Sequence, residues 1–163
     1  MANSVAALPP EIAKRVSFSL LVLRISLGLF FFFWAIEKFI IPGKVVELYK
    51  KFYHTSVSME MTYAVGVVLT VVALAVLAGA YRKWSYGFVL VAHTITIVFS
   101  WHRIIDPYGL IPKAAKGSMF EGMFTGQPMH LFLASIPVWG ACFLLYHLRD
   151  YDTRSYDGRR AAG

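Results

Sequence analysis

Residues 16–41 read VSFSLLVLRISLGLFFFFWAIEKFII, and this apolar stretch decides the fold class. An α-helix rises about 1.5 Å per residue, so roughly 20 apolar residues cross the hydrocarbon core of a bilayer. The stretch is therefore long enough to span a membrane. It also contains Arg24, Glu37 and Lys38. Charged side chains are costly in a bilayer, so those found there usually face a bundle interior or a functional site.

The composition of the whole chain agrees with this interpretation. Of its 163 residues, 58% are hydrophobic and only 15% are charged, which is too apolar for an ordinary soluble domain. We expect one integral membrane domain over residues 1–163. The net charge of +7 is best explained by basic residues that flank the apolar segments and meet anionic lipid. No nucleic-acid-binding pattern accompanies the charge, so we expect no nucleic-acid partner.

Four apolar segments predict the architecture: residues 16–41, 59–80, 84–105 and 129–148, each with uncertain ends. Only helices satisfy their own backbone in lipid when no closed barrel can form. The sequence therefore predicts an all-α integral membrane four-helix bundle. Outer loops would cover residues 42–58 and 106–128, and a cytoplasmic tail would cover 149–163. Within the first loop KVVELYKKFY has the spacing of a short amphipathic helix, and the second loop is a candidate lid.

An even number of spans places both termini on one side of the membrane. The basic pair Arg82–Lys83 falls in the very short second turn, and short basic loops favour the cytoplasmic side. We therefore expect cytoplasmic termini. Cys142 is the only cysteine, which excludes an intrachain disulfide and a CxxC redox pair.

Two features concern helix packing. Small residues on one face of the second span favour close approach of a neighbouring helix, and Pro137 predicts a kink in the fourth span. The small residues are Thr62, Gly66, Thr70 and Ala73.

One group of polar residues is predicted near the outer membrane boundary: Glu37, Lys38, Glu60, His102, Arg103, Asp106 and His130. Carboxylates and histidines that are partly buried can exchange protons near neutral pH, which suits a quinol site. His102 and His130 could instead bind a metal with Glu37 or Glu60. A third interpretation is that all of these side chains are solvated at the headgroup level.

Arg24 and His93 are expected deeper, at similar levels. No carboxylate is expected at the depth of Arg24, which could reach the cytoplasmic surface, bond backbone carbonyls, or contact an anion or a quinone carbonyl. His93 could hydrogen-bond across helices. It could also bind haem b, although a second axial ligand at that depth is lacking in this chain.

The first span resembles the DoxX-like family of small four-helix membrane proteins. The similarity lies in Arg24, in Gly28 four residues on, and in the Glu37–Lys38 pair that ends the span, followed by Pro42. Ala35 stands where the family often has glycine, and the tail RSYDGRR is similar to basic, aspartate-containing endings in the family. The resemblance implies a membrane bundle related to the membrane subunits of thiosulfate:quinone oxidoreductase. It also implies location in a bacterial or archaeal inner membrane.

Together these observations predict a membrane subunit of a redox complex linked to the quinone pool. Glu37 and His130 would be the proton-active groups, and Arg24, Lys38, His93 and His102 would contact or tune the quinone. Haem b and a metal stay open as cofactors. Lipid and other membrane or redox subunits are the expected partners. Two alternatives are a non-catalytic accessory or assembly subunit and a small-solute transporter.

Overall fold

The computed structural model describes residues 8–53, 55–106, 108 and 130–162, and within them the regular structure is helical. The long helices are α1 (Pro10–Ile40), α3 (Met59–Ala78) and α4 (Arg82–Ile105). The shorter elements are α2 (Pro42–Tyr53), the 3-10 turn η1 (His130–Ala134), α5 (Ser135–His147), the 3-10 turn η2 (Arg149–Tyr151) and α6 (Tyr156–Ala162). The predicted lid loop lies mostly outside the described residues.

Three of the helices are long and apolar enough to cross a membrane: α1, α3 and α4. They confirm long apolar helices over the first three predicted segments, and α1 begins several residues earlier than expected, with Pro10 in its first turn. Proline is favoured there because its missing N–H has no partner to lose. Ser58 begins α3, and its hydroxyl accepts a hydrogen bond from the amide of Met61 at 3.2 Å.

The predicted fourth span differs from the other three. It consists of η1 followed by the 13-residue helix α5, so its apolar helical part is shorter than α1, α3 or α4. We expected Pro137 to kink this span, but it does not interrupt the helix midway. It lies in the first turn of α5, where a proline removes no intrahelical hydrogen bond.

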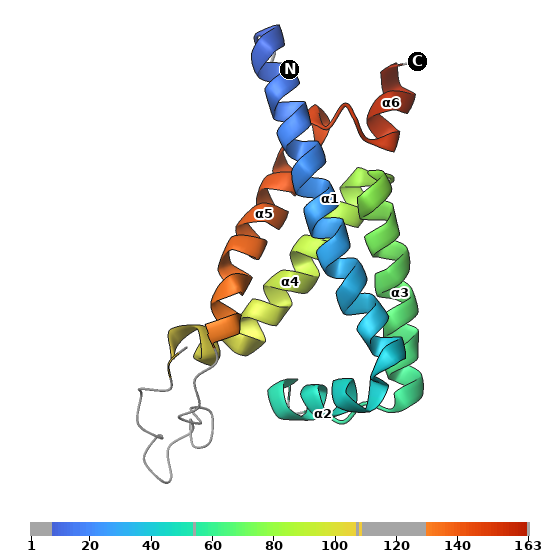
Figure 1. Cartoon of the computed structure of the whole chain (residues 1–163), viewed down its shortest axis with the longest axis vertical. Helices are drawn as coiled ribbons and strands as arrows, with labels where there is room; N and C mark the ends of the chain where they lie inside the picture. Colours follow the sequence, from blue (N-terminus) through green and yellow to red (C-terminus); the bar gives the residue numbers. More distant parts are fainter. Residues whose placement is uncertain (1–7, 54, 107, 109–129, 163) are drawn as a thin grey trace, which may run out of the picture.

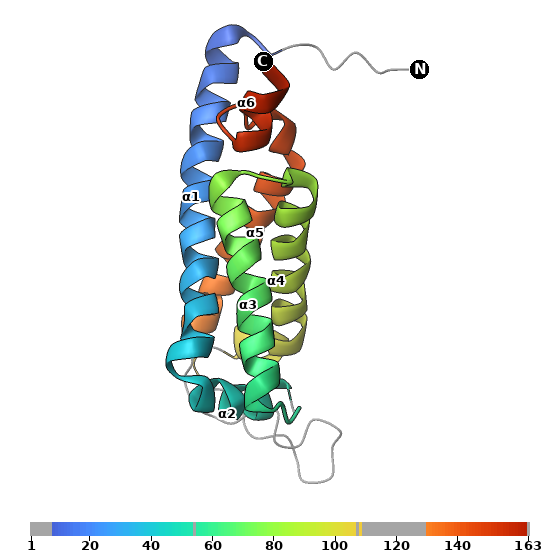
Figure 2. The same ribbon diagram turned by 90° about the vertical axis from the view of Figure 1, so that its right-hand side faces the viewer.

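The four apolar helical segments contact one another in a ring, α1 with α3, α3 with α4, α4 with α5, and α5 with α1. Figure 2 shows them running side by side, with α2 crossing one end and α6 at the other. Toward the α2 end, the α1–α3 pair and the α4–α5 pair diverge (Figure 1). The start of α1 and the end of α6 lie at the same end of the molecule (Figure 1).

The α1–α3 contact is the most extensive in the molecule, and small residues make it possible. A Cβ on Gly66 would lie 2.9 Å from the ring of Phe39, and a Cβ on Gly28 would lie 2.6 Å from the side chain of Leu77. Thr62 and Ala73 are also buried. The small face predicted on the second span is therefore confirmed as a packing surface.

Candidate functional site

A cavity of about 350 Å³ lies where the α1–α3 pair and the α4–α5 pair diverge. We call it the aromatic cavity. Every helical element from α1 to α5 contributes to its wall. The lining residues are Phe30, Phe31, Trp34, Glu37, Lys38, Val45, Leu48, Tyr49, Leu69, Val72, Phe88, Val89, Ala92, His93, Thr96, Phe132, Ala134, Ser135 and Val138. Its size and its apolar wall with a few polar groups are typical of a small-molecule site.

Helix α2 forms part of the wall of this cavity. Its predicted amphipathic character is confirmed, because Val45 is only 5% exposed while Lys44 is exposed. Helix α2 lies across one end of the bundle (Figure 1). Its residues Val45, Leu48 and Tyr49 line the cavity.

His93 is one of the polar groups in the wall. It is 7% exposed, and its Nε2 lies 3.1 Å from the carbonyl oxygen of Ser135 on α5. Because a carbonyl only accepts, Nε2 must carry the proton, and Nδ1 of the neutral ring is then an acceptor. The rings of Phe30 and Phe31 meet His93 edge-on, with centroids 6.3 and 6.1 Å away. The interhelical hydrogen bond expected for His93 is thus present, and it fixes the tautomer.

Lys38 and Glu37 lie at the α2 end of the same cavity. The ammonium group of Lys38 is buried and donates to the backbone carbonyl of Trp34 at 2.9 Å. An ammonium has three N–H donors, so this bond leaves capacity for a ligand. Glu37 is half-buried at the cavity wall. The cavity therefore combines a donor, an acceptor and a carboxylate on largely apolar walls.

Four other residues predicted for the outer cluster are not among the residues that line this cavity: Glu60, His102, Arg103 and Asp106. His102, Arg103 and Asp106 are buried near the end of α4, where His102 is nine residues, or about 13 Å of helix, beyond His93. Glu60 is exposed at the start of α3. The side chain of His130 lies outside the described residues, so its pairing with Glu37 stays a prediction.

Metal binding has no visible support in the described part of the chain. Within residues 8–53, 55–106, 108 and 130–162, no three His, Cys, Asp or Glu side chains are grouped as metal ligands. The predicted His102–His130 metal site involves a side chain beyond that part. Cys142 is buried in the core between the helices.

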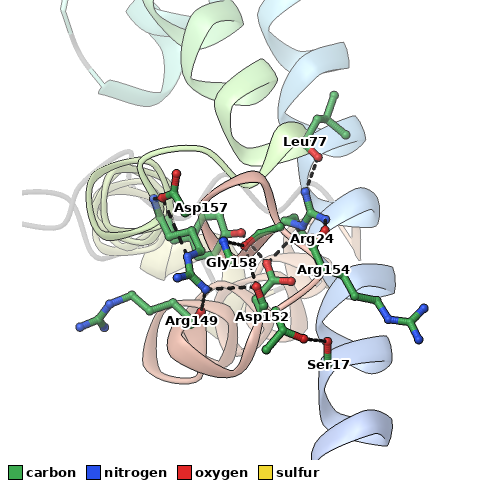
Figure 3. Close-up of polar contacts among 12 residues, drawn as sticks. Ser17, Arg24, Leu77, Arg149, Asp152, Arg154, Asp157 and Gly158 are labelled. Atoms are coloured by element: carbon green, nitrogen blue, oxygen red, sulfur yellow. Dashed lines mark hydrogen bonds and ion pairs between the residues drawn. The ribbon is translucent and has the colours of Figure 1, made fainter. Parts of the chain in front are cut away.

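Arg24 belongs to a different site, at the opposite end from α2. The expectation that no carboxylate reaches its depth is wrong, because the chain folds back after α5 and brings Asp152 to it. Arg24 Nε lies 3.2 Å from Asp152 Oδ2, with both side chains almost fully buried (Figure 3). Its Nη1 also donates to the carbonyl of Leu77 on α3. Capping of backbone carbonyls, one of the roles expected for Arg24, is therefore what the structure shows.

The expectation that Arg24 and His93 share a level is also wrong. His93 contacts Phe30 and Phe31, which are six and seven residues further along α1 than Arg24, or about 10 Å. The guanidinium of Arg24 bonds protein groups and does not line the aromatic cavity. Arg24 is therefore placed as a structural residue and not among the cavity's ligand contacts.

Asp152 is the centre of what we call the tail cluster: Arg24, Arg82, Tyr86, Asp152 and Asp157. The hydroxyl of Tyr86 on α4 donates to Asp152 Oδ2 at 2.7 Å. Arg82 donates to the backbone carbonyl of Asp152 at 3.1 Å, and the amide of Arg82 donates to Asp157 at 2.9 Å. One tail segment therefore bonds to α1, to the α3–α4 turn and to α4.

The turn between α3 and α4 fits closely against the tail. Gly79 has φ +68°, and a Cβ on it would lie 2.4 Å from Cβ of Ser155. Its carbonyl accepts the amide of Asp157 at 3.2 Å. Residues of the predicted tail therefore pack against the helices, and the cytoplasmic location of that tail stays a prediction. The sequence analysis did not identify Asp152 and Tyr86 as partners of Arg24. The one indication in the sequence was an arginine in an apolar span with no carboxylate expected at its depth, which calls for a partner from elsewhere in the chain.

The chain finds no counterpart in three comparisons: no protein-family model, no curated protein and no solved structure matches it.

Proposed function

We propose that this chain is a four-span integral membrane protein that binds a quinone in the aromatic cavity and serves as a redox component linked to the quinone pool. The observation that carries the proposal is the cavity itself. It is mostly aromatic and aliphatic, and its polar groups include Lys38, Glu37 and His93, with Tyr49, Thr96 and Ser135. A quinone head group is a flat, apolar ring with carbonyl acceptors, which this combination of groups suits.

Membrane insertion is supported by the outer surface of the helices. Large apolar side chains are exposed along them, for example Val67 and Val71 on α3 and Val98 on α4, at 54%, 62% and 60% exposure. Lipid would cover these side chains. For the fourth span, η1 and α5 together would extend about 30 Å if they share an axis, which matches the hydrocarbon thickness.

The polar groups would divide the work at a bound ring. Lys38 would donate a hydrogen bond to one carbonyl oxygen, since only one of its three donors is used by Trp34. His93 Nδ1 would accept a hydrogen bond from a quinol hydroxyl, because Nε2 is held as a donor to Ser135. On oxidation of a quinol, the two electrons would pass to a partner redox subunit, Glu37 would take up one of the two released protons, and His130 is the proposed acceptor of the other. A bound quinone would supply the two-electron redox chemistry that the chain's own side chains lack.

The resemblance of the first span to DoxX-like proteins points in the same direction. It adds a bacterial or archaeal inner membrane and partner redox subunits to the proposal. Cytoplasmic termini are supported by Arg82 and Lys83 in the short turn at the tail end. The roles predicted for His130 as a proton partner and for His102 as a tuning residue stay predictions, and His102 is not among the residues that line the cavity.

The experiment compares two neighbouring residues on α4. Ala92 lines the aromatic cavity, whereas Val91 is 59% exposed on the outer surface. Ala92→Phe would fill part of the cavity, and Val91→Phe would add the same ring on the outside. Binding of a short-chain ubiquinone to the purified protein in detergent would be followed by quenching of tryptophan fluorescence, since Trp34 is in the wall.

We expect saturable binding to the wild type and to Val91→Phe, and binding at least about tenfold weaker to Ala92→Phe. Equal affinities for all three proteins would contradict a quinone site in this cavity. In that case the accessory-subunit interpretation would gain support if the chain copurified in fixed ratio with catalytic subunits. Uptake of a solute into proteoliposomes would instead favour a transporter.

A further inference from the structure

A second hollow lies at the tail end of the molecule, between α1, α3 and the tail. It is an open groove of about 530 Å³, lined by Leu21, Arg24, Ile25, Leu77, Ala78, Thr153, Arg154 and Arg159. We call it the basic groove. It shares no lining residue with the aromatic cavity.

The charge of this groove is entirely positive. Three of its lining residues are arginines, and no acidic side chain is among the described residues that line it. Arg24 is bonded to Asp152, but Arg154 and Arg159 are exposed. Arg154 extends away from the ion pair along α1, as Figure 3 shows, and its guanidinium lies over the ring of Phe18 at 5.4 Å. Two arginine side chains are thus available to an anion.

The other wall of the groove is apolar and belongs to the helices that would cross the membrane. Leu21 and Ile25 are one turn apart on α1. Leu77 and Ala78 are the last two residues of α3. The short turn to α4 follows at once, so this groove lies at the level where α3 ends and α4 begins. A ligand there would meet guanidinium groups at its head and hydrocarbon along its length.

From this arrangement we infer that the basic groove binds one anionic phospholipid from the leaflet on the tail side. The phosphodiester pairs with Arg154 and Arg159, since guanidinium groups match phosphate oxygens in geometry and charge. An acyl chain lies against Leu21, Ile25 and Leu77. A zwitterionic lipid fits less well, because its ammonium group adds positive charge to a basic site. This inference does not depend on the quinone proposal.

Native mass spectrometry of the full chain tests the inference, with phosphatidylglycerol and phosphatidylcholine of the same acyl chains as probes. The test variant is Arg154→Gln with Arg159→Gln. Its matched control is Arg15→Gln with Arg160→Gln, which removes the same charge from exposed arginines outside the groove. The side chain of Arg154 can be changed without loss of the Arg24 bond, because that bond uses the backbone carbonyl of Arg154.

We expect the wild type and the control to retain phosphatidylglycerol about tenfold better than phosphatidylcholine, and the test variant to lose this preference. Arg154→Lys with Arg159→Lys should keep most of it, which separates lost charge from lost folding. An equal loss in the control would show diffuse attraction and overturn the inference. Displacement of the lipid by millimolar inorganic phosphate would do so as well, since the site would then be one for the free anion.

Discussion

The two ends of this helix bundle use polar residues in opposite ways. In the tail cluster, Asp152 is completely buried and bonds Arg24 and Tyr86. These bonds hold α1, α4 and the tail together. In the aromatic cavity, His93 and Lys38 each bond one backbone carbonyl and keep further hydrogen-bonding capacity beside an open volume. The first arrangement gives stability, and the second leaves groups that can bind a ligand.

The difference explains why a charged residue in an apolar span is ambiguous on sequence grounds. Arg24 and Lys38 are on the same helix, and both are almost fully buried. Only the partner distinguishes them: a carboxylate from the tail for Arg24, and a carbonyl of its own helix for Lys38. Substitutions should therefore separate stability effects at the tail end from binding effects at the other.

The largest effect is expected from Asp152→Ala. It leaves the guanidinium of Arg24 buried without its carboxylate, and breaking a buried ion pair costs about 3–5 kcal/mol. Thermal unfolding in detergent should show a large loss of stability. Asp152→Asn keeps an acceptor for Tyr86 and should be affected less. A protein as stable as the wild type in both cases would mean that the tail cluster does not hold the bundle together.

A smaller loss is expected from Gly79→Ala. The residue has φ +68°, and a Cβ would lie 2.4 Å from Cβ of Ser155, so the added methyl group forces the tail away at a cost of about 1–3 kcal/mol. Gly140→Ala is the matched control, because a Cβ there meets no atom within 4 Å. Alanine in that helix should be neutral or slightly stabilising. Thermal unfolding of the two variants should differ accordingly, and equal transitions would contradict the close fit of the tail.

Tyr86→Phe removes one hydrogen bond to Asp152 and nothing else of the cluster. The expected loss of stability is about 1 kcal/mol, since interhelical hydrogen bonds in membrane proteins are individually modest. Tyr81→Phe is the control, because Tyr81 is 76% exposed. Denaturation curves should distinguish the two, and quinone binding should be unchanged in both. A change in binding for Tyr86→Phe would show that the two ends are coupled.

The smallest effect on stability, and a clear one on binding, is expected from Lys38→Met. The methionine keeps an unbranched apolar chain and removes a buried ammonium group, so stability should change by less than about 1 kcal/mol. Affinity for a short-chain ubiquinone should fall about tenfold through loss of one charged donor. Lys44→Met, on the exposed side of α2, should bind as the wild type does. Equal binding by both variants would remove Lys38 from the site.

Much of the fold could be predicted from the sequence, because it depends on local properties. The length of the apolar segments predicted the three long helices, and apolar residues at helical spacing predicted α2. The small residues predicted a close helix contact, which is the one between α1 and α3. The fourth segment was less well predicted. Its apolar composition is continuous from Met129 to Leu148, yet the α-helix begins only at Ser135, after a 3-10 turn.

The sites were harder to predict, because they depend on contacts between distant residues. Arg24 and Asp152 are 128 positions apart, and no periodicity links them. Helical depth correctly placed Glu37 and Lys38 toward one end of the bundle but did not show that His93 faces the same cavity. The cavity that these residues share lies where the α4–α5 pair diverges from the α1–α3 pair (Figure 1). That arrangement is a tertiary property.

The most direct test of the account is photolabelling of the purified protein with an azido-quinone, followed by peptide mapping. We predict label on residues 30–38 and 88–96, prevented by excess unlabelled ubiquinone, because these segments form the cavity wall. Label spread over the outward-facing residues of α3, or concentrated on residues 21–25 and 153–159 of the basic groove, would contradict the account. In either case the open volume beside Lys38 and His93 would not be a quinone site.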